Sequence, residues 1–514
     1  MSDPNNTPAS PAAKPNRMAR FRNWLSLAGV VLAISAFFAF VLLFAVDLFA
    51  THANPYMGIL AYVVAPMFLL MGLAMVITGY VLESRRIRKG LPERDKGFVL
   101  KVDLSRKRDR KLLVGFVGGS LGFIFLTALG SYQTYHLTET NSFCGETCHL
   151  PMDPQFKAYQ HSAHAKVACV ACHVGPGAGN YIRTKISGVR QLYHTILGDF
   201  NRPIRLHNVN QRPAMETCQS CHWSQKHTGD VQRSYKRFLA DETNTPFTVN
   251  MVMKVGGSDP VRGPVEGIHS HMNVNNKVEF IALDPDRVKI PWVRTTNLAT
   301  GQVTEYRTPE FKDDISKHDI RVMDCMDCHN RPSHKFMTPN AAVDLAMGYG
   351  RINPSIPWVK NKVVKALTGL VGEEGEKAVT YATREDAEKQ IDRFLRKEYP
   401  DLKEIDTLVE QAKIIYNTNF YPEMKADWRV HPDHIGHKDG PGCFRCHDGQ
   451  HLATDGKTSI KASDCNACHI ITSQGNGADL EKLSPKGVIF NHPMDMGEME
   501  TPNCSECHTG QLQE

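Results

Sequence analysis

Hydrophobic positions concentrate in three uncharged stretches near the start of the chain, at residues 24–46, 53–82 and 112–135. Each stretch is at least as long as the roughly 20 residues that a helix needs to cross a bilayer. A cleaved signal peptide is the alternative for the first stretch, but its length and the second stretch close behind it argue against cleavage. The pattern therefore predicts three transmembrane helices after a polar cytoplasmic tail, residues 1–23. Four small residues in the third helix would permit close helix contact: Gly115, Gly118, Gly119 and Gly122.

Charge is distributed unevenly around these stretches. The loop at residues 83–111 carries 12 Lys and Arg against 5 Asp and Glu. Because positively charged loops stay in the cytoplasm, we expect the third helix to run outward across a bacterial inner membrane. Everything after Tyr135 would then lie in the periplasm. Residues 112–514 hold 44 basic against 47 acidic side chains, so the net charge of +6 comes from the membrane region and gives no support for a nucleic-acid partner.

Beyond the membrane region, two parts of the chain show clear periodicity. Apolar residues alternate between 246 and 306, which predicts a small antiparallel β insert that covers cofactors. Further on, Thr383-x-x-Asp386 has the pattern of a helix-start capping box. Apolar residues recur at helical spacing from Ile405 to Tyr416, and Pro400 separates the two segments. These patterns predict a helical arm.

The cysteines carry the most specific chemistry. All 14 fall into seven motifs in which a cysteine pair is followed at once by histidine, the spacing of covalent c-type haem attachment. Six motifs are C-x-x-C-H and the first is C-x-x-x-C-H. The motifs are Cys144, Cys148, His149; Cys169, Cys172, His173; Cys218, Cys221, His222; Cys325, Cys328, His329; Cys443, Cys446, His447; Cys465, Cys468, His469; and Cys504, Cys507, His508. Zinc or redox sites are the alternative, but they leave the adjacent histidine unexplained.

Seven haems c therefore organise the predicted architecture, a mainly helical and irregular multihaem cytochrome c with a small antiparallel β insert and three N-terminal transmembrane helices. The predicted regions follow the motifs. They are the membrane anchor at 24–135, a region with haems 1 to 3 at 136–235, the β insert with haem 4 at 236–335, the helical arm at 336–420 and a region with haems 5 to 7 at 421–514.

Sixteen histidines lie outside the motifs, enough to supply a second axial ligand for every iron. The best candidates lie beside motifs or in the β insert: His164, His227, His269, His334 and His451. A histidine four or five residues past a motif is poorly placed to reach the other face of its own haem, so it would bind a neighbouring haem. The alternative for each is a surface position or a contact with a haem propionate.

Other histidines are weaker candidates as ligands. His271 shares a strand face with His269 in our expectation, and we assign it to a propionate. Four more precede the last motifs: His431, His434, His437 and His492. At the first haem, Met152 follows His149 closely, so its thioether is either an axial ligand or a packing side chain.

The segment from Phe143 to His149, together with Met152, the Ser-Ala-His ending at His164 and the motif ending at His173, resembles the NapC/NirT/NrfH family of membrane-anchored cytochromes. Over its whole length the chain resembles the ImcH type of inner-membrane heptahaem cytochrome. The segments that carry this wider resemblance are Glu216 to Trp223, Ile290 to Arg294, Cys328 to His334 and Pro441 to Gly449.

The resemblance implies that menaquinol is oxidised near the first haem and that electrons leave through periplasmic haems. In the NrfH branch a methionine after the first motif binds iron and a lysine lies in the quinol pocket, and Met152 and Lys185 are the matching positions. The extra residue in the first motif departs from that branch, as does the lack of a matching aspartate, since Asp199 and Glu146 are only nearby acids. Arg183 and Arg190 are assigned to propionates or phospholipid headgroups.

These features favour an electron-transfer quinol dehydrogenase that passes electrons from the menaquinone pool to soluble periplasmic cytochromes, in anaerobic or extracellular respiration. One alternative is the reverse current, in which an outside donor reduces quinone. Another is a terminal reductase of nitrogen or sulfur oxyanions, which needs an open iron. The sequence leaves the direction of flow and homo-oligomer formation open.

Overall fold

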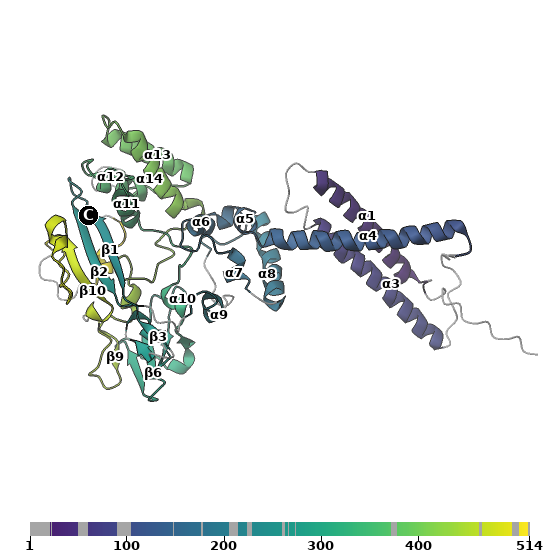
Figure 1. Cartoon of the computed structure of the whole chain (residues 1–514), viewed down its shortest axis with the longest axis horizontal. Helices are drawn as coiled ribbons and strands as arrows, with labels where there is room; N and C mark the ends of the chain where they lie inside the picture. Colours follow the sequence, from purple (N-terminus) through teal and green to yellow (C-terminus); the bar gives the residue numbers. More distant parts are fainter. Residues whose placement is uncertain are drawn as a thin grey trace, which may run out of the picture. The chain divides into compact units, whose positions relative to one another are not determined.

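The computed structural model describes residues 21, 23–49, 60–89, 104–147, 149–175, 178–204, 214–223, 229–259, 263–265, 267–272, 274–371, 378–461, 465–495 and 503–511. The chain divides into two compact units, Met1–Thr147 and Cys148–Glu514. The elements of both units are labelled in Figure 1. Each unit is considered by itself below.

The first unit confirms the three predicted membrane helices. It contains α1 (Trp24–Phe49), a π-helical turn (Leu60–Val64) that continues into α3 (Ala65–Arg88), and α4 (Lys107–Thr138), followed by the short α5 (Asn141–Glu146). Three of these helical segments are long and apolar enough to cross a membrane. Three basic residues lie in the last turn of α3 before the charged loop, namely Arg85, Arg86 and Arg88.

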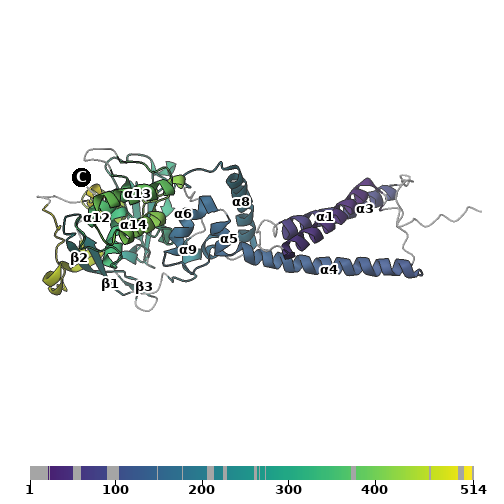
Figure 2. The same cartoon turned by 90° about the horizontal axis from the view of Figure 1, so that it is seen from above.

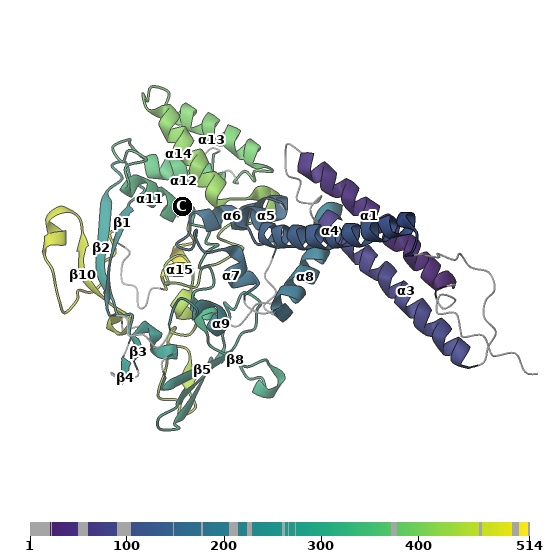
Figure 3. The same cartoon turned by 45° about the vertical axis from the view of Figure 1, so that its right-hand side comes forward.

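Close packing in this unit occurs between α1 and α3, which lie side by side (Figures 1 and 3). A Cβ added at Gly29 would lie 2.6 Å from the Gly72 carbonyl oxygen, and one at Gly79 would lie 2.3 Å from Ser26 Oγ. Small residues therefore let the two backbones approach. The expectation for α4 is wrong, because a Cβ would meet no atom of the described structure within 4 Å at any of its four predicted contact positions: Gly115, Gly118, Gly119 and Gly122.

The second unit begins with short helices that carry the first cysteine motifs. They are α6 (His149–Gln160), α7 (Cys169–His173), α8 (Ala178–Leu197) and α9 (Ala214–Cys218), followed later by α10 (Cys325–Cys328) and α15 (Cys504–Cys507). Most are only one or two turns long. Helices α6 and α8 are longer, with 12 and 20 residues.

The strands form three antiparallel sheets. A three-stranded sheet has the order β1 (Val231–Phe238), β2 (Pro246–Met253), β10 (His469–Gly475). A five-stranded sheet has the order β8 (Arg321–Val322), β5 (Asn276–Ile281), β6 (Trp292–Asn297), β7 (Val303–Arg307), β9 (Leu452–Ala453), and a two-stranded ladder joins β3 (Gly257–Asp259) to β4 (Gly263–Val265). The antiparallel insert is confirmed, but two of its sheets recruit strands from the last hundred residues.

One local assignment in the insert is wrong. His269 and His271 do not share a strand face, because residues Ile268–Met272 form a 3₁₀-helix. Its start is set by Gly267, whose φ of +142° lies in the region that favours glycine. Because a 3₁₀-helix has three residues per turn, side chains two residues apart point in different directions.

The region predicted as a helical arm contains four described helices with their own apolar core. They are α11 (Pro339–Gly348), α12 (Val359–Thr368), α13 (Arg384–Glu398) and α14 (Ile405–Asn419), seen from another side in Figure 2. Thr383 Oγ1 accepts the Asp386 N–H at 3.1 Å and so caps α13 as predicted. Val359, Val363 and Ile391 are fully buried among the helices. This part of the chain therefore folds around aliphatic side chains.

A buried ion pair connects the arm to β1. Lys360 Nζ lies 2.8 Å from Asp344 Oδ1, and the same oxygen accepts the Phe238 N–H at 3.1 Å. Both side chains are nearly inaccessible to water, and burial lowers the pKa of Lys360. Breaking one partner of such a pair leaves an uncompensated charge, so the contact fixes the sheet against the arm.

Gly442, in the turn before the fifth motif, has a backbone conformation that favours glycine. Gly442 has a φ of +44°, and an added Cβ would lie 1.7 Å from the Gly436 carbonyl oxygen, which accepts the Cys443 N–H at 2.9 Å. Gly442→Ala should destabilise this region by about 2 kcal/mol or more. The midpoint of thermal unfolding, followed by circular dichroism, checks this.

Gly440→Ala is the matched control. An added Cβ there would meet only the Asp433 carbonyl oxygen, at an ordinary 3.9 Å, and Gly440 has no positive φ. An equal loss of stability in the two variants would show that the Gly442 backbone conformation is not the cause.

Candidate haem centres

The regular cysteine motifs lie on single helical turns. Motif 2 forms α7, motif 3 begins at the end of α9, and motifs 4 and 7 form α10 and α15. Motif 5 includes a 3₁₀-helix, Gly442–Arg445, and motif 6 includes another, Cys465–Ala467. A turn of helix places residues i and i+3 on the same face. In motifs 2, 4 and 7, where one helix holds both cysteines, the two attachment thiols therefore share one side of the turn.

Every motif histidine from the second motif to the seventh faces one other histidine. The distances between ring centroids span 5.8 to 6.3 Å. The pairs are His173 with His334, His222 with His164, His329 with His269, His447 with His271, His469 with His437, and His508 with His492.

This spacing is suited to a metal ion between the two rings. A metal–nitrogen bond of about 2 Å, plus the roughly 1 Å from that nitrogen to the ring centroid, gives about 6 Å for two imidazoles on opposite sides of one ion. The six pairs therefore fit iron held between two histidines.

The non-motif member of several pairs is oriented through its other ring nitrogen. The Nδ1 atom of His334 lies 2.9 Å from the Gln155 carbonyl oxygen, and that of His271 lies 2.7 Å from the Ile268 carbonyl oxygen. His164 and His492 make similar contacts, at 3.2 Å to Pro332 O and 3.0 Å to Met494 O. A metal-binding histidine usually donates its second N–H in this way, which leaves Nε2 for the metal.

Burial favours the neutral imidazole that a metal requires. It lowers the pKa of His334 to about 4. It also lowers the pKa of seven other members of the pairs: His173, His269, His329, His437, His447, His469 and His508.

The structure brings three of the expected second ligands to motif histidines. His164 and His334 face the motifs of neighbouring haems instead of their own, and His269 faces His329. His271, which we had assigned to a propionate, faces His447 instead. The expected ligand His227 lies outside the described residues, as does Cys148, and nothing is described of the side chains of His149 and Cys465.

His451 corrects a prediction. Its side chain is completely buried, with Nδ1 2.8 Å from Asp448 Oδ1 and Nε2 2.7 Å from the Ile290 carbonyl oxygen. Both nitrogens already have protein partners, so neither can bind iron. Two weaker candidates, His437 and His492, occupy ligand positions in its place.

Neighbouring motifs contact one another in chain order. Helix α7 packs against α9, and α9 packs against α10. Cys218 in motif 3 lies next to Cys325 in motif 4. Attachment points two, three and four therefore form a continuous series.

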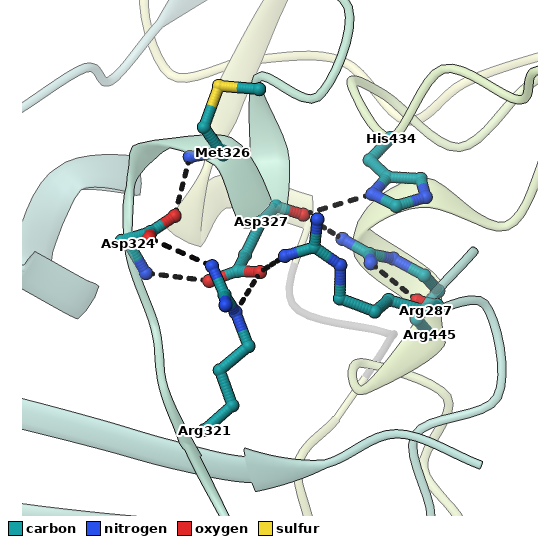
Figure 4. Close-up of polar contacts among 7 residues, drawn as sticks. All are labelled: Arg287, Arg321, Asp324, Met326, Asp327, His434 and Arg445. Atoms are coloured by element: carbon teal, nitrogen blue, oxygen red, sulfur yellow. Dashed lines mark hydrogen bonds and ion pairs between the residues drawn. The ribbon is translucent and has the colours of Figure 1, made fainter. Parts of the chain in front are cut away.

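Motif 4 is joined to motif 5 by a buried polar network around Asp327 (Figure 4). The Asp327 carboxylate forms ion pairs with Arg287 and with Arg321, whose Nε lies 2.8 Å away. The Asp327 carbonyl oxygen accepts hydrogen bonds from Arg445 Nη2 at 2.7 Å and from His434 Nδ1 at 3.1 Å. Because Asp327 and Arg445 are the inner residues of two motifs, the network fixes one attachment turn to the next.

Two buried polar atoms near this network have no hydrogen-bond partner among the described protein atoms, Arg331 Nη2 and His434 Nε2. Both side chains are at least nine-tenths buried, and burial lowers the pKa of Arg331 to about 10. Leaving such groups unpaired is costly. A propionate carboxylate of haem would supply the partner that Arg331 Nη2 lacks. His434 donates its Nδ1–H to Asp327, so its free Nε2 carries a lone pair that suits a metal and not a carboxylate. Both residues fit the cofactor that the motifs imply.

Near the first motif, Met152 lies half-buried on α6. The neighbouring Asp153 forms an ion pair with Arg384 of the helical arm at 2.6 Å. On α8, the Lys185 ammonium lies 5.0 Å from the Tyr181 ring centroid. Asp199, considered above as a nearby acid, lies 2.8 Å from His194 Nδ1.

Apolar spans followed by attachment turns whose histidines face second histidines define a membrane-anchored multihaem cytochrome c. The model of the NapC/NirT cytochrome c family, N-terminal region, matches residues 106–243. The chain is 35% identical over 502 residues to the cytochrome c-type protein ImcH of Geobacter sulfurreducens, covering 95% of each chain. The chain therefore belongs to the family of ImcH-type, NapC/NirT-related cytochromes c.

Two further similarities cover shorter parts of the chain. The chain is 35% identical over 82 residues to the cytochrome c-type protein NrfH of Wolinella succinogenes, covering 15% of this chain and 45% of that protein. It is 33% identical over 107 residues to a putative tetraheme cytochrome-c type protein of Allochromatium vinosum, covering 19% and 54%. No solved structure matches the chain.

Proposed function

We propose that this protein is an inner-membrane heptahaem cytochrome c that oxidises menaquinol and passes electrons to soluble periplasmic cytochromes, in anaerobic or extracellular respiration. The observation that carries the proposal is the series of histidine pairs, with contacts between successive motifs, in a chain that also has three membrane spans. Such an arrangement suits movement of electrons away from a membrane. The basic residues that end α3 support a cytoplasmic loop and a periplasmic haem region.

The six histidine pairs are the proposed axial ligands of haems 2 to 7. Iron with two histidine ligands has no open position for substrate, which disfavours a terminal oxyanion reductase at these sites. At the first haem, His149 and Met152 are the proposed ligands. When bound, the haems supply one-electron redox chemistry, and the protein sets their spacing, ligands and surroundings.

Quinol oxidation also requires groups that bind the headgroup and take up protons. Lys185 is the proposed headgroup ligand, because its ammonium can donate a hydrogen bond to a quinol oxygen. A nearby acid would accept a proton, as general base catalysis requires. Asp199 already pairs with His194, so it is a weaker candidate for this role.

His334→Gly tests the ligand assignment. Loss of the His334 imidazole would leave one face of the motif-2 iron open, so one low-spin iron should become high-spin in low-temperature EPR spectra. His451→Gln is the control, since both nitrogens of His451 have protein partners. Retention of every low-spin signal in His334→Gly would contradict the assignment.

Arg331→Met tests the propionate contact. Removing a buried positive charge disfavours the reduced, more negative haem by about 1 to 2 kcal/mol at a separation near 10 Å. A redox titration should show one midpoint potential falling. Arg429→Met, at an exposed arginine paired with Asp427, should leave the potentials unchanged, and the same shift in both variants would contradict the contact.

Lys185→Ala tests the quinol site. Oxidation of a menaquinol analogue by detergent-purified protein should fall about tenfold or more, the cost of losing a charged hydrogen bond of roughly 1.5 kcal/mol. Haem content and reduction by dithionite should stay normal. Lys166→Ala, at an exposed lysine, is the control. Unchanged turnover in Lys185→Ala would remove Lys185 from the site.

A further inference from the structure

Helix α8 carries a row of apolar side chains that the described protein leaves uncovered. Six of them are between 56% and 73% exposed: Ile182, Ile186, Val189, Tyr193, Ile196 and Leu197. At about 100° per residue, all six fall on one continuous arc of the helix. Exposed apolar patches of this kind mark a surface that contacts another apolar phase or molecule.

The rest of the helix surface is divided in a regular way. On one side of the apolar arc lie the exposed Arg183 and Arg190, followed by Ser187 and Gln191. The remaining face is half-buried against the protein and includes Tyr181, Thr184 and Leu192. No acidic residue occurs anywhere in Ala178–Leu197.

We infer that α8 lies in the plane of the membrane surface, with its apolar arc inserted among the lipid acyl chains and Arg183 and Arg190 at the phosphate groups. Three observations favour lipid over a protein partner. The chain is already anchored by three spans, α8 itself contains basic residues and no acid, and a helix with these three faces is typical of interfacial helices. Asp199, which follows the helix, is paired with His194. Long arginine side chains can reach headgroups while their stems cover apolar surface.

With α8 at the membrane surface, Lys185 lies at a defined depth in the membrane. On the helix, Lys185 lies between the apolar arc and the half-buried face, next to the direction of Val189 and Ile196. It would therefore sit where acyl chains meet the protein. This step rests on the proposed quinol function. A lipid-soluble quinol that reached α8 from the bilayer would meet Lys185 at the edge of the apolar arc.

Substituted cysteines test the location. All native cysteines belong to the haem motifs, so an introduced thiol is the only one outside them. Ile186→Cys and its neighbour Ser187→Cys would be compared in full-length protein, one copy per nanodisc of anionic lipid, using a membrane-impermeant maleimide. Position 186 should react at least tenfold more slowly than position 187. Equal rates would overturn the inference.

A photoreactive group in the lipid acyl chain identifies what covers the arc. It should attach to the peptide at residues 178–197. Protection of position 186 without lipid attachment would overturn the inference, because another part of the protein would then cover the arc. Haem absorbance verifies that each variant is intact. The labelling does not require turnover, so it stands or falls separately from the Lys185→Ala result.

Discussion

The spacing of about 6 Å between paired imidazoles is the constraint on which the haem region depends. Several pairs join segments that are distant in the chain, as His173 and His334 show. A second pair joins His222 to His164. The Pro332 carbonyl oxygen, in the segment after motif 4, orients His164. The positions of α7, α9 and the segment after motif 4 are therefore set together. Few apolar residues are buried in this part of the chain, so the cofactor and its ligands take the place of a core.

Sequence alone predicted the features that depend on neighbouring residues. The cysteine motifs, the spans and the capped helix at Thr383 are local patterns, and the structure has a turn or helix at each described one. Pairing over long distances is different. His334 and His451 both follow a motif by a few residues, yet only His334 faces another motif histidine. The difference lies in Asp448 and the Ile290 carbonyl. Ile290 lies just before β6, in a distant segment that no local pattern could place beside His451.

The helical arm holds no cysteine motif and has a core of ordinary aliphatic packing. Two of its polar connections indicate why it is present. Arg384 binds Asp153 on α6, next to Met152, while Lys360 and Asp344 hold the end of β1. The arm thus supports both the segment after the first motif and the three-stranded sheet that carries His469 on β10. A rigid unit of this kind fixes parts of the haem region that cannot bury enough apolar surface to fix themselves.

The variable residues of the attachment motifs are more than spacers. Electron transfer between haems requires stable separations, and covalent attachment fixes each haem only to its own turn. At motifs 4 and 5 the relation between turns is set by the inner residues Asp327 and Arg445. Arg445 binds the Asp327 backbone carbonyl, a group that substitution at position 327 would not remove, while the carboxylate is held by two further arginines. The contact between these two motifs therefore depends on the Arg445 side chain and on the Asp327 backbone, so a change of side chain at position 327 alone leaves this contact in place.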